Sequence, residues 1–335
     1  MAQFSQIISV IDTHTEGEPT RIVLSGLPPI RGTSMADKMA YAHANMDHLR
    51  RALMLEPRGH RDMFGAILTS PCLPEADFGL LFMESGGFLT MCGHGTIGTT
   101  MMLLEMGMVE AKEPETVVVF DTPAGLVRAH AIVEHGKASR IWIENVPSFL
   151  LKADVPVEVE GLGVITVDIA FGGNFFALIS ADQIGVPLES RRIKDLVDIG
   201  LRVREAVNQQ VPVEHPIEKH INKVELTEIT GPAVHPQANA RNIMIFGEGS
   251  VDRSPCGTGT CARMAEMYAK GQLKLGEPFV HESIIGSIFQ GELLREVKVG
   301  PFTAVVPRFS GNAYITGIQQ FVIDPADPMK YGFLV

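Results

Sequence analysis

The residues best suited to chemistry are two cysteines, each of which opens the same glycine-rich phrase. Cys92 begins Cys-Gly-His-Gly-Thr-Ile-Gly, and Cys256 begins Cys-Gly-Thr-Gly-Thr-Cys-Ala in the second half of the chain. Each cysteine is followed 15 residues later by a further glycine, Gly107 or Gly271. Two thiols at matching places in two half-chains suit a reaction that needs an acid and a base on opposite faces of one carbon atom.

The segments that follow the two cysteines have the pattern of helices, at 96–106 and at 260–270. The first turn of a helix presents N–H groups that lack an acceptor within the helix, together with a positive partial charge. A cysteine at such a position has a lowered pKa and more thiolate character. The same N–H groups can bind a carboxylate. The two motifs therefore predict two reactive thiols that face one shared cleft.

A dinucleotide-binding fingerprint is one alternative interpretation. Gly93, Gly95 and Gly98 fit the pattern G-x-G-x-x-G, and a strand-like run at 117–120 ends before Asp121. That fingerprint supplies no reason for a cysteine directly before the first glycine in both copies. The surrounding chain also lacks regular alternation of strand and helix. A nucleotide-dependent oxidoreductase is therefore a minor alternative.

Purely structural cysteines and a metal site are two further alternatives. A buried cysteine often acts only as a small apolar side chain, which is our interpretation of Cys72 and Cys261. For Cys92 and Cys256 the flanking glycines and the following helix favour a reactive thiol. The sequence contains no Cys-x-x-Cys, His-x-x-x-His or His-Glu-x-x-His, so zinc has little support. It also lacks a phosphate-binding loop and a lysine context typical of pyridoxal phosphate.

The composition is that of a soluble globular chain, with 45% hydrophobic and 20% charged residues among 335. A formal charge of −11 argues against nucleic acid or an anionic membrane surface as a partner. No apolar run approaches the roughly 18 residues of a membrane span, and the start has none of the features of an export signal. With only 4 cysteines, free thiols in a reducing cytoplasm are expected.

Short strand-like runs outnumber helical ones, which predicts mixed α/β domains that are richer in strand than in helix. The chain is long enough for two domains, and residues 145–160 are a candidate crossing between them. Helices are expected at 35–52, 96–106, 193–210 and 260–270. Strands are expected at 7–11, 21–24, 66–69, 79–82, 116–120, 125–131, 141–143, 163–171, 175–179, 223–229, 242–246 and 302–306.

In the two cysteine motifs and in several other short phrases the chain resembles the proline racemase family. The similarity covers almost the whole chain, and the two cysteine phrases together are highly specific. The matching phrases lie at 14–21 (His-Thr-Glu-Gly-Glu-Pro-Thr-Arg), 56–60 (Glu-Pro-Arg-Gly-His), 91–98, 252–260 and 327–333.

The resemblance implies an α/β fold of the diaminopimelate epimerase type. Two pseudo-symmetric domains would each wrap a sheet around a central helix, with the active site in the cleft between them. We expect residues 1–150 with 315–335 in the first domain and 151–314 in the second. Members of the family use no cofactor or metal and are commonly homodimers.

The resemblance and the motifs together assign roles to individual residues. Cys92 and Cys256 would be the catalytic acid and base. Backbone N–H groups in the two glycine-rich phrases would bind the substrate carboxylate. The side chains of Asp252 and His94 would hold its ammonium group, although from spacing alone Asp252 fits a turn or cap residue equally well. The substrate-binding positions in these phrases are Gly93, His94, Gly95, Thr96, Asp252, Gly257 and Thr258.

The side chains expected around the substrate ring are apolar and favour proline. Phe64 and Phe246 match positions that enclose the pyrrolidine ring in racemases. 4-Hydroxyproline 2-epimerases tend to carry polar groups there, including a histidine where this chain has Leu226 and often a tyrosine where it has Phe176. Dehydratases of trans-3-hydroxyproline carry threonine in place of Cys256. The alternatives are thus the epimerase, then the dehydratase or a non-catalytic imino-acid-binding protein.

Overall fold

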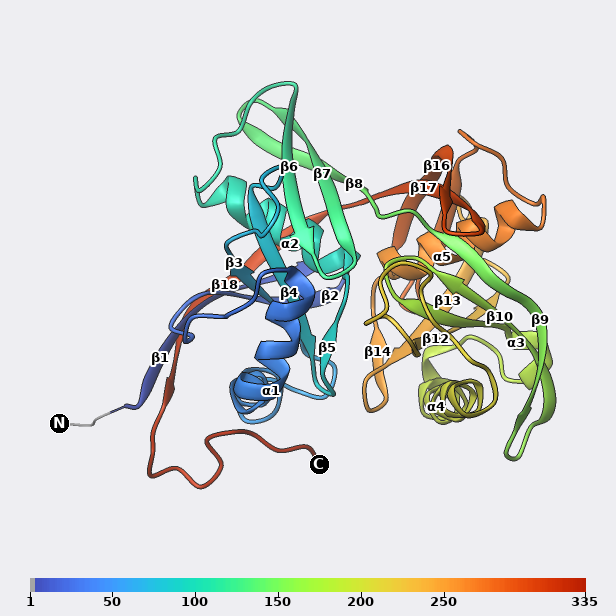
Figure 1. Ribbon diagram of the computed structural model, residues 1–335, viewed down its shortest axis with the longest axis horizontal. Coiled ribbons are helices and arrows are strands. Elements are labelled where there is room, and N and C mark those ends of the chain that lie inside the picture. Colours follow the sequence, from blue (N-terminus) through green and yellow to red (C-terminus); the bar gives the residue numbers. More distant parts are fainter. Residues whose placement is uncertain (1–3) are drawn as a thin grey trace. The chain divides into compact units, whose positions relative to one another are not determined.

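The computed structural model describes residues 4–335 and divides the chain into two compact units (Figure 1). Unit 1 consists of the residues up to Ile141 together with Asn312–Val335, and unit 2 consists of Trp142–Gly311. Within the described residues no helix combines the length and the apolar character needed to span a bilayer.

Unit 1 is one mixed sheet with two helices. Strands β18, β1 and β2 pair antiparallel, β2 and β3 pair parallel, β3 and β4 antiparallel, β4 and β6 parallel, and β6 and β7 antiparallel. Its elements are β1 (Gln6–Thr15), β2 (Glu18–Ser25), α1 (Met35–Met54), β3 (Phe64–Thr69), β4 (Phe78–Glu84), β5 (Phe88–Leu89), α2 (Gly93–Glu105), β6 (Glu115–Thr122), β7 (Gly125–Glu134), the boundary strand β8 (Lys137–Glu144) and β18 (Ala313–Ile323).

Unit 2 repeats this order of pairings with its own elements. Strands β9, β10 and β11 pair antiparallel, β11 and β12 parallel, β12 and β13 antiparallel, β13 and β15 parallel, and β15, β16 and β17 antiparallel. Its elements are β9 (Phe149–Val159), β10 (Gly163–Phe171), β11 (Phe175–Ser180), α3 (Ala181–Ile184), a 3-10 turn (Ser190–Arg192), α4 (Ile193–Gln210), β12 (Val224–Gly231), β13 (Ala240–Phe246), β14 (Ser250–Asp252), α5 (Gly257–Ala269), β15 (Phe279–Glu282), β16 (Ile288–Val299) and β17 (Phe302–Gly311).

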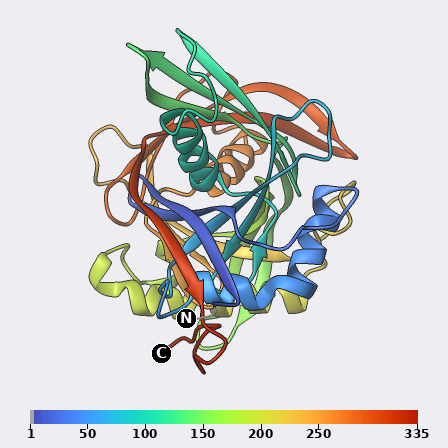
Figure 2. The same ribbon diagram turned by 90° about the vertical axis from the view of Figure 1, so that its left-hand side faces the viewer.

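Helix α2 is buried along its whole length except for its last residue, Glu105. It contacts β1, β2, β3, β7 and β18, and Figure 2 shows it in teal beside β1 in blue and β18 in red. A helix that is buried all round must satisfy its polar side chains internally. Thr96, Thr99 and Thr100 do so by donating to carbonyl groups four residues earlier, at 2.7, 2.7 and 2.8 Å. In unit 2, α5 makes the equivalent contacts with β9, β10, β11, β16 and β17.

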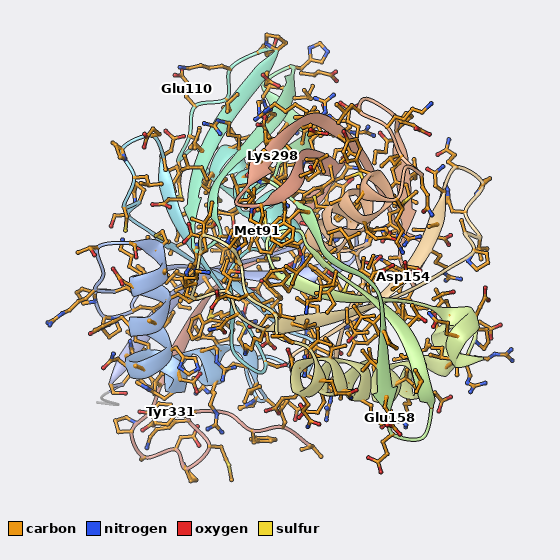
Figure 3. The ribbon with its side chains drawn as sticks, turned by 45° about the vertical axis from the view of Figure 1, so that its right-hand side comes forward. Met91, Glu110, Asp154, Glu158, Lys298 and Tyr331 are labelled. Carbon is orange, nitrogen blue, oxygen red and sulfur yellow. The ribbon has the colours of Figure 1, made fainter. Side chains whose placement is uncertain are left out.

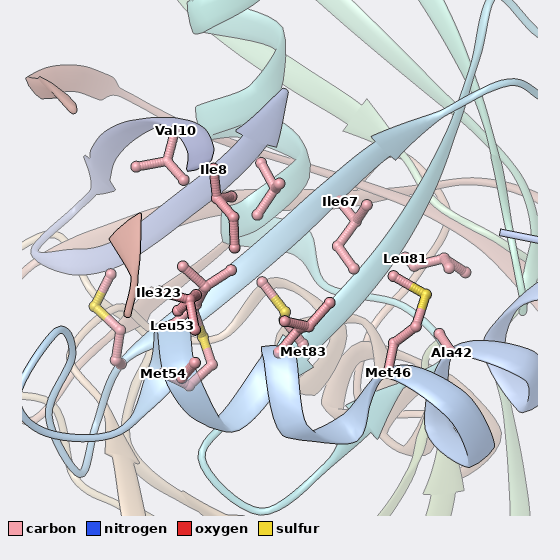
Figure 4. Close-up of a cluster of buried hydrophobic side chains, with 14 of the residues drawn as sticks. Ile8, Val10, Ala42, Met46, Leu53, Met54, Ile67, Leu81, Met83 and Ile323 are labelled. Atoms are coloured by element: carbon pink, nitrogen blue, oxygen red, sulfur yellow. The ribbon is translucent and has the colours of Figure 1, made fainter. Parts of the chain in front are cut away.

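The other long helix of unit 1, α1, closes an apolar core. Ser34 caps this helix by accepting a hydrogen bond from the Asp37 N–H at 3.0 Å, and the Asp37 carboxylate accepts from the Ser34 N–H at 3.1 Å. This reciprocal capping box fixes where the helix begins. Met46 and Leu53 of the helix are buried in one cluster with side chains of β1, β3, β4 and β18 (Figure 4).

The four expected helices correspond to α1, α2, α4 and α5, although α2 and α5 each begin three residues before the expected start. Residues 149–159, which lie in the expected crossing segment, form strand β9 instead. Its outward charged residues Asp154 and Glu158 are exposed (Figure 3), while Val157 and Val159 are buried. This alternation is that of a strand with one solvated face.

Candidate active site

Cys92 is the N-cap of α2, and its sulfur accepts the hydrogen bond that starts the helix. The Gly95 N–H donates to Sγ at 3.3 Å, and the Cys92 carbonyl accepts from the Thr96 N–H and hydroxyl at 3.2 and 2.7 Å. Cys92 is 4% exposed, and the preceding Met91 is fully buried (Figure 3). A sulfur held against a first-turn N–H is stabilised when it carries negative charge.

His94 lies directly beside this sulfur. Its Nδ1 is 3.3 Å from Cys92 Sγ, its carbonyl accepts from the Thr15 hydroxyl at 2.8 Å, and its ring meets that of Phe64 edge to face at 4.6 Å. Burial lowers the pKa of His94 to about 3, against a smaller upward effect of a backbone contact with Pro19. The imidazole is therefore neutral near pH 7, and a neutral ring nitrogen can accept a hydrogen bond.

Cys256 caps α5 in the same manner from a different backbone conformation. The Gly259 N–H donates to its Sγ at 3.4 Å, and its carbonyl accepts from the Thr260 N–H at 2.8 Å. Thr258 Oγ1 lies 3.5 Å from the sulfur. The backbone has φ 60° and ψ 110°, which is unusual for a residue with a side chain and marks a strained position.

Asp252 lies next to Cys256 through a bridging serine. Asp252 Oδ1 accepts from the N–H and hydroxyl of Ser254 at 2.8 and 2.7 Å, and the Cys256 N–H donates to Ser254 Oγ at 3.1 Å. Burial raises the pKa of Asp252 to about 6, and the hydrogen bonds from Ser254 act against that rise. The carboxyl group is thus mainly ionised at pH 7. Ser254 was not among the expected site residues, although a serine two residues after an aspartate is a common turn signal.

The expected ring-enclosing residues are all buried. Phe64 is 2% exposed and contacts the site through His94. Phe246 is 2% exposed and pairs with Ser250 on the hairpin that carries Asp252. Leu226 and Phe176 are paired neighbours on β12 and β11.

The structure thus gathers the expected residues around two helix ends. Cys92, Gly93, His94, Gly95 and Thr96 lie together in unit 1, with Phe64 packed on His94. Cys256, Gly257 and Thr258 lie together in unit 2, with Asp252 beside them. We call these groups the Cys92 site and the Cys256 site.

The remaining cysteines fit a packing role. Cys261 is fully buried, and burial raises the pKa of its thiol far above the usual range. Cys72 is partly buried against the core of unit 1. Across residues 4–335 no three side chains of the metal-binding types come together as a candidate metal site.

Comparison with known proteins places almost the whole chain in one family. A family model described as proline racemase matches residues 10–334. The proline racemase of Clostridioides difficile is 50% identical over 333 residues, which are 99% of this chain and 99% of the relative. A 4-hydroxyproline 2-epimerase of Streptosporangium roseum is 44% identical over 98% of this chain and 99% of that protein.

Solved structures of other proteins have a similar fold over nearly the whole chain. A probable proline racemase from Agrobacterium radiobacter, with bound carbonate, has a TM-score of 0.94 and 35% identity over 98% of this chain and 96% of that one. A PhzF-family protein of Bacillus anthracis has a TM-score of 0.60 at 14% identity, over 95% of this chain and 99% of that one. The second similarity concerns the fold alone.

Proposed function

This chain belongs to the proline racemase family, and from that membership we propose that it interconverts the enantiomers of proline at the α-carbon without a cofactor. The observation that carries the proposal is the pair of cysteine caps. In each unit the sulfur of the cap accepts a hydrogen bond from a glycine N–H, at 3.3 Å in the Cys92 site and 3.4 Å in the Cys256 site. A protein that only binds an imino acid has no use for two matched thiols.

The two sulfurs act as a base and an acid on one substrate. One cysteine, as the thiolate, removes the α-proton from one face of the carbon, and the other, as the thiol, delivers a proton to the opposite face. In the reverse direction the two roles exchange. Thiols suit this exchange because their unperturbed pKa of about 8.5 lies close to neutrality, where proton transfer in both directions is efficient.

The carbanion-like transition state places negative charge on the substrate carboxylate. First-turn N–H groups of a helix have no acceptor within that helix and are oriented to bind an anion. We assign this role to the N–H groups of Gly93 and His94 in α2 and of Gly257 and Thr258 in α5. The N–H groups of Gly95 and Thr96, in the same phrase, instead hold the cap through the sulfur and the carbonyl of Cys92. Fixed dipoles aimed at developing charge are commonly the largest contribution to catalysis.

The substrate ammonium is assigned to Asp252 and His94. The Asp252 carboxylate supplies a negative charge in a buried setting. The neutral imidazole of His94 can accept a hydrogen bond from the ammonium group. Together these two groups would orient the α-carbon relative to the two sulfurs.

At the level of the whole chain, we propose the arrangement of the diaminopimelate epimerase type. Units 1 and 2 would then each supply one cysteine to a substrate bound in the cleft between two pseudo-symmetric domains. Residues 1–150 with 315–335 and residues 151–314 remain the proposed domain limits. A homodimer and a cytoplasmic location stay predictions.

Proline is the proposed substrate because the residues assigned to its ring lack a hydrogen-bonding group. Phe64, Phe246, Leu226 and Phe176 offer neither a donor nor an acceptor in their side chains. A hydroxyl group on the ring would lose its bonds to water and gain no replacement from these side chains, which is costly.

The test is incubation of the purified protein with L-proline, D-proline, trans-4-hydroxy-L-proline and trans-3-hydroxy-L-proline without added cofactor, followed by chiral chromatography. We expect each proline enantiomer to yield the other at the highest kcat/KM of the set. Preferred epimerisation of the 4-hydroxy compound would make the chain an epimerase. Loss of water from the 3-hydroxy compound would make it a dehydratase, and binding without turnover would reject the enzymatic proposal.

A further inference from the structure

Four polar side chains are completely buried beneath α5 in unit 2. They are Glu228 of β12, Asn242 of β13, Thr260 of α5 and His281 of β15, each with 0% exposure. Glu228 Oε1 lies 3.5 Å from His281 Nε2, and His281 Nδ1 lies 3.0 Å from Thr260 Oγ1. Buried polar groups normally have hydrogen-bond partners, so the partners of these four have to be found within the cluster.

Four acceptor positions of the cluster have no donor, because the Asn242 amide and the Thr260 hydroxyl donate to the Pro255 carbonyl. Both carboxyl oxygens of Glu228, Oδ1 of Asn242 and Nε2 of His281 have no hydrogen-bond partner. The Thr260 hydroxyl donates to the Pro255 carbonyl, so in its contact with His281 Nδ1 it accepts, which places the ring proton on Nδ1 and leaves Nε2 as an acceptor. A carboxylate, an amide oxygen and this ring nitrogen cannot satisfy one another. A single proton on Glu228 turns an acceptor into a donor and removes the conflict.

We propose that Glu228 is a neutral carboxylic acid that donates to Nε2 of His281 and thereby positions the Pro255–Cys256 turn. The hydrogen bonds from His281 to the Pro255 carbonyl then run in one direction, and Asn242 Nδ2, which lies 3.4 Å from His281 Nδ1, donates to that carbonyl and not to the ring. His281 Nδ1–H donates to Thr260 Oγ1, and the Thr260 hydroxyl donates to the Pro255 carbonyl at 3.3 Å. The Asn242 amide also donates to that carbonyl at 2.8 Å.

The hydrogen bonds from Asn242 and Thr260 fix the carbonyl of Pro255, which directly precedes the strained Cys256. Cys256 has φ 60°, a conformation that persists only where its surroundings enforce it. Glu228 also packs against Gly259, whose N–H donates to the Cys256 sulfur. A Cβ added at Gly259 would be 3.0 Å from Glu228 Oε2. Glu228 and His281 are therefore positioning residues for Cys256, an assignment that rests on the proposed function for its catalytic consequence.

Burial, more than the surrounding charges, favours a neutral Glu228 and a neutral His281 over an ion pair. From α5 the cluster faces Arg263 and Glu266, which form an ion pair with each other at 2.6 Å, and from β15 it faces His281. Burial raises the pKa of Glu228 to about 8, although Arg263 and the side chain of Asn242 act against the rise. Burial also lowers the pKa of His281 to about 3. The opposite face of β12 packs on α4, where Thr227 donates to the Gly200 carbonyl.

Infrared spectroscopy of the full-length protein at pH 7 tests the protonation directly. We expect the carbonyl stretch of a protonated carboxylic acid in the wild type and its loss in Glu228→Gln. Glu282→Gln is the matched control, because Glu282 is also buried but accepts from the N–H groups of Val234 and His235 at 2.6 and 2.8 Å. A wild type without this band, or a band that survives in Glu228→Gln, would overturn the proposal.

Thermal unfolding against pH gives a second readout that needs no activity. A carboxyl whose pKa is raised on folding stabilises the fold below its unfolded pKa, and this contribution is lost as the pH rises towards the folded pKa. The Tm of Glu228→Gln minus that of the wild type should therefore increase between pH 5 and about pH 8. Two curves that stay parallel over that range would count against a buried neutral acid.

Kinetics test the positioning role. The amide of Glu228→Gln can donate to His281 as the acid does, so we expect its kcat to stay within about twofold of the wild type. Glu228→Leu removes the donor, and kcat should fall about tenfold or more with KM little changed, because small misplacements of a reacting group are costly. Equal kcat in Glu228→Leu and wild type would refute the positioning role. A wild type inactive on every imino acid would refute the proposed function instead, and the spectroscopic and unfolding results would still decide the protonation.

Discussion

At the scale of the residue, Cys92 and Cys256 reach the same sulfur–amide contact by two backbone routes. Cys92 is extended, with φ −141°, whereas Cys256 is left-handed, with φ 60°. The left-handed residue needs additional support, which Asn242 and Thr260 supply through the carbonyl of Pro255. The Cys256 site is therefore the one whose geometry depends more strongly on its surroundings.

Replacing either cysteine by serine separates chemistry from folding. Serine is a favourable N-cap, so Cys92→Ser and Cys256→Ser should keep a Tm close to that of the wild type. The hydroxyl is far too weak an acid to exchange a proton near neutral pH, so racemisation should fall by about 10²-fold or more in each variant. Polarimetry with L-proline measures the rate, and a single variant with wild-type activity would refute the two-base scheme.

The pH dependence of substrate capture depends on Asp252. Its carboxyl must be ionised to bind an ammonium group, and burial raises its pKa to about 6. We predict that kcat/KM decreases as the pH falls through about 6, since the protonated form cannot pair with the cation. Asp252→Asn should have low kcat/KM throughout and should lose the inflection near pH 6, while the decrease caused by protonation of the cysteine base remains. A wild-type profile that is flat between pH 5 and 7 would argue against the assignment.

At the scale of the element, each cysteine-capped helix, α2 or α5, closely approaches a neighbouring segment of its sheet at a glycine. In unit 1 the glycine is on the helix, where a Cβ at Gly98 would lie 2.5 Å from Thr13 Oγ1 of β1. In unit 2 it follows strand β10, where a Cβ at Gly172 would lie 2.6 Å from the Ala262 backbone nitrogen of α5. At both positions the absence of a side chain allows the cysteine-capped helix to lie close to its sheet.

Gly98→Ala should therefore reduce the free energy of unfolding by about 1–3 kcal/mol through overpacking. Thr13→Ala removes the nearest atom, so the double variant should be more stable than the sum of the two single effects predicts. Urea unfolding of the four proteins gives this coupling. Strict additivity would show that Thr13 does not limit the approach of α2.

The helical patterns were sufficient to predict all four long helices, but not where the two central helices begin. Gly93, Gly95, Gly257 and Gly259 resemble a loop in sequence, and the structure places them in the first turns of α2 and α5. A cap made by cysteine sulfur is outside the usual signals for a helix start. Strand β9 was missed because its lysine, acidic residues and proline resemble a linker.

The sequence was sufficient to predict the site residues that lie within one short motif. It was not sufficient for residues that come together only through the order of the strands. The cysteines and the residues after them were identified from one motif each. Glu228 and His281 are far apart in sequence and meet only because β12, β13 and β15 are consecutive strands of one sheet. Nothing in the spacing of two isolated polar residues indicates such a pair.

At the scale of the whole molecule, the two units carry the same order of pairings and each holds one cysteine-capped helix. That duplication suits a reaction whose substrate and product are mirror images, because the forward and reverse directions need the same two groups in exchanged roles. The match of the family model to residues 10–334 includes both cysteine motifs. The proposed chemistry therefore depends on both halves of the chain.

Racemisation of L-proline in D2O, followed by mass spectrometry of the separated enantiomers at early times, tests the two-thiol exchange most directly. Thiol protons exchange with solvent, so the acid that completes each turnover carries deuterium. We predict D-proline with one deuterium at Cα, while the unreacted L-proline retains its protium. D-proline that retains the original α-proton would mean that one group carries the proton from face to face, and would contradict a mechanism that uses both cysteines.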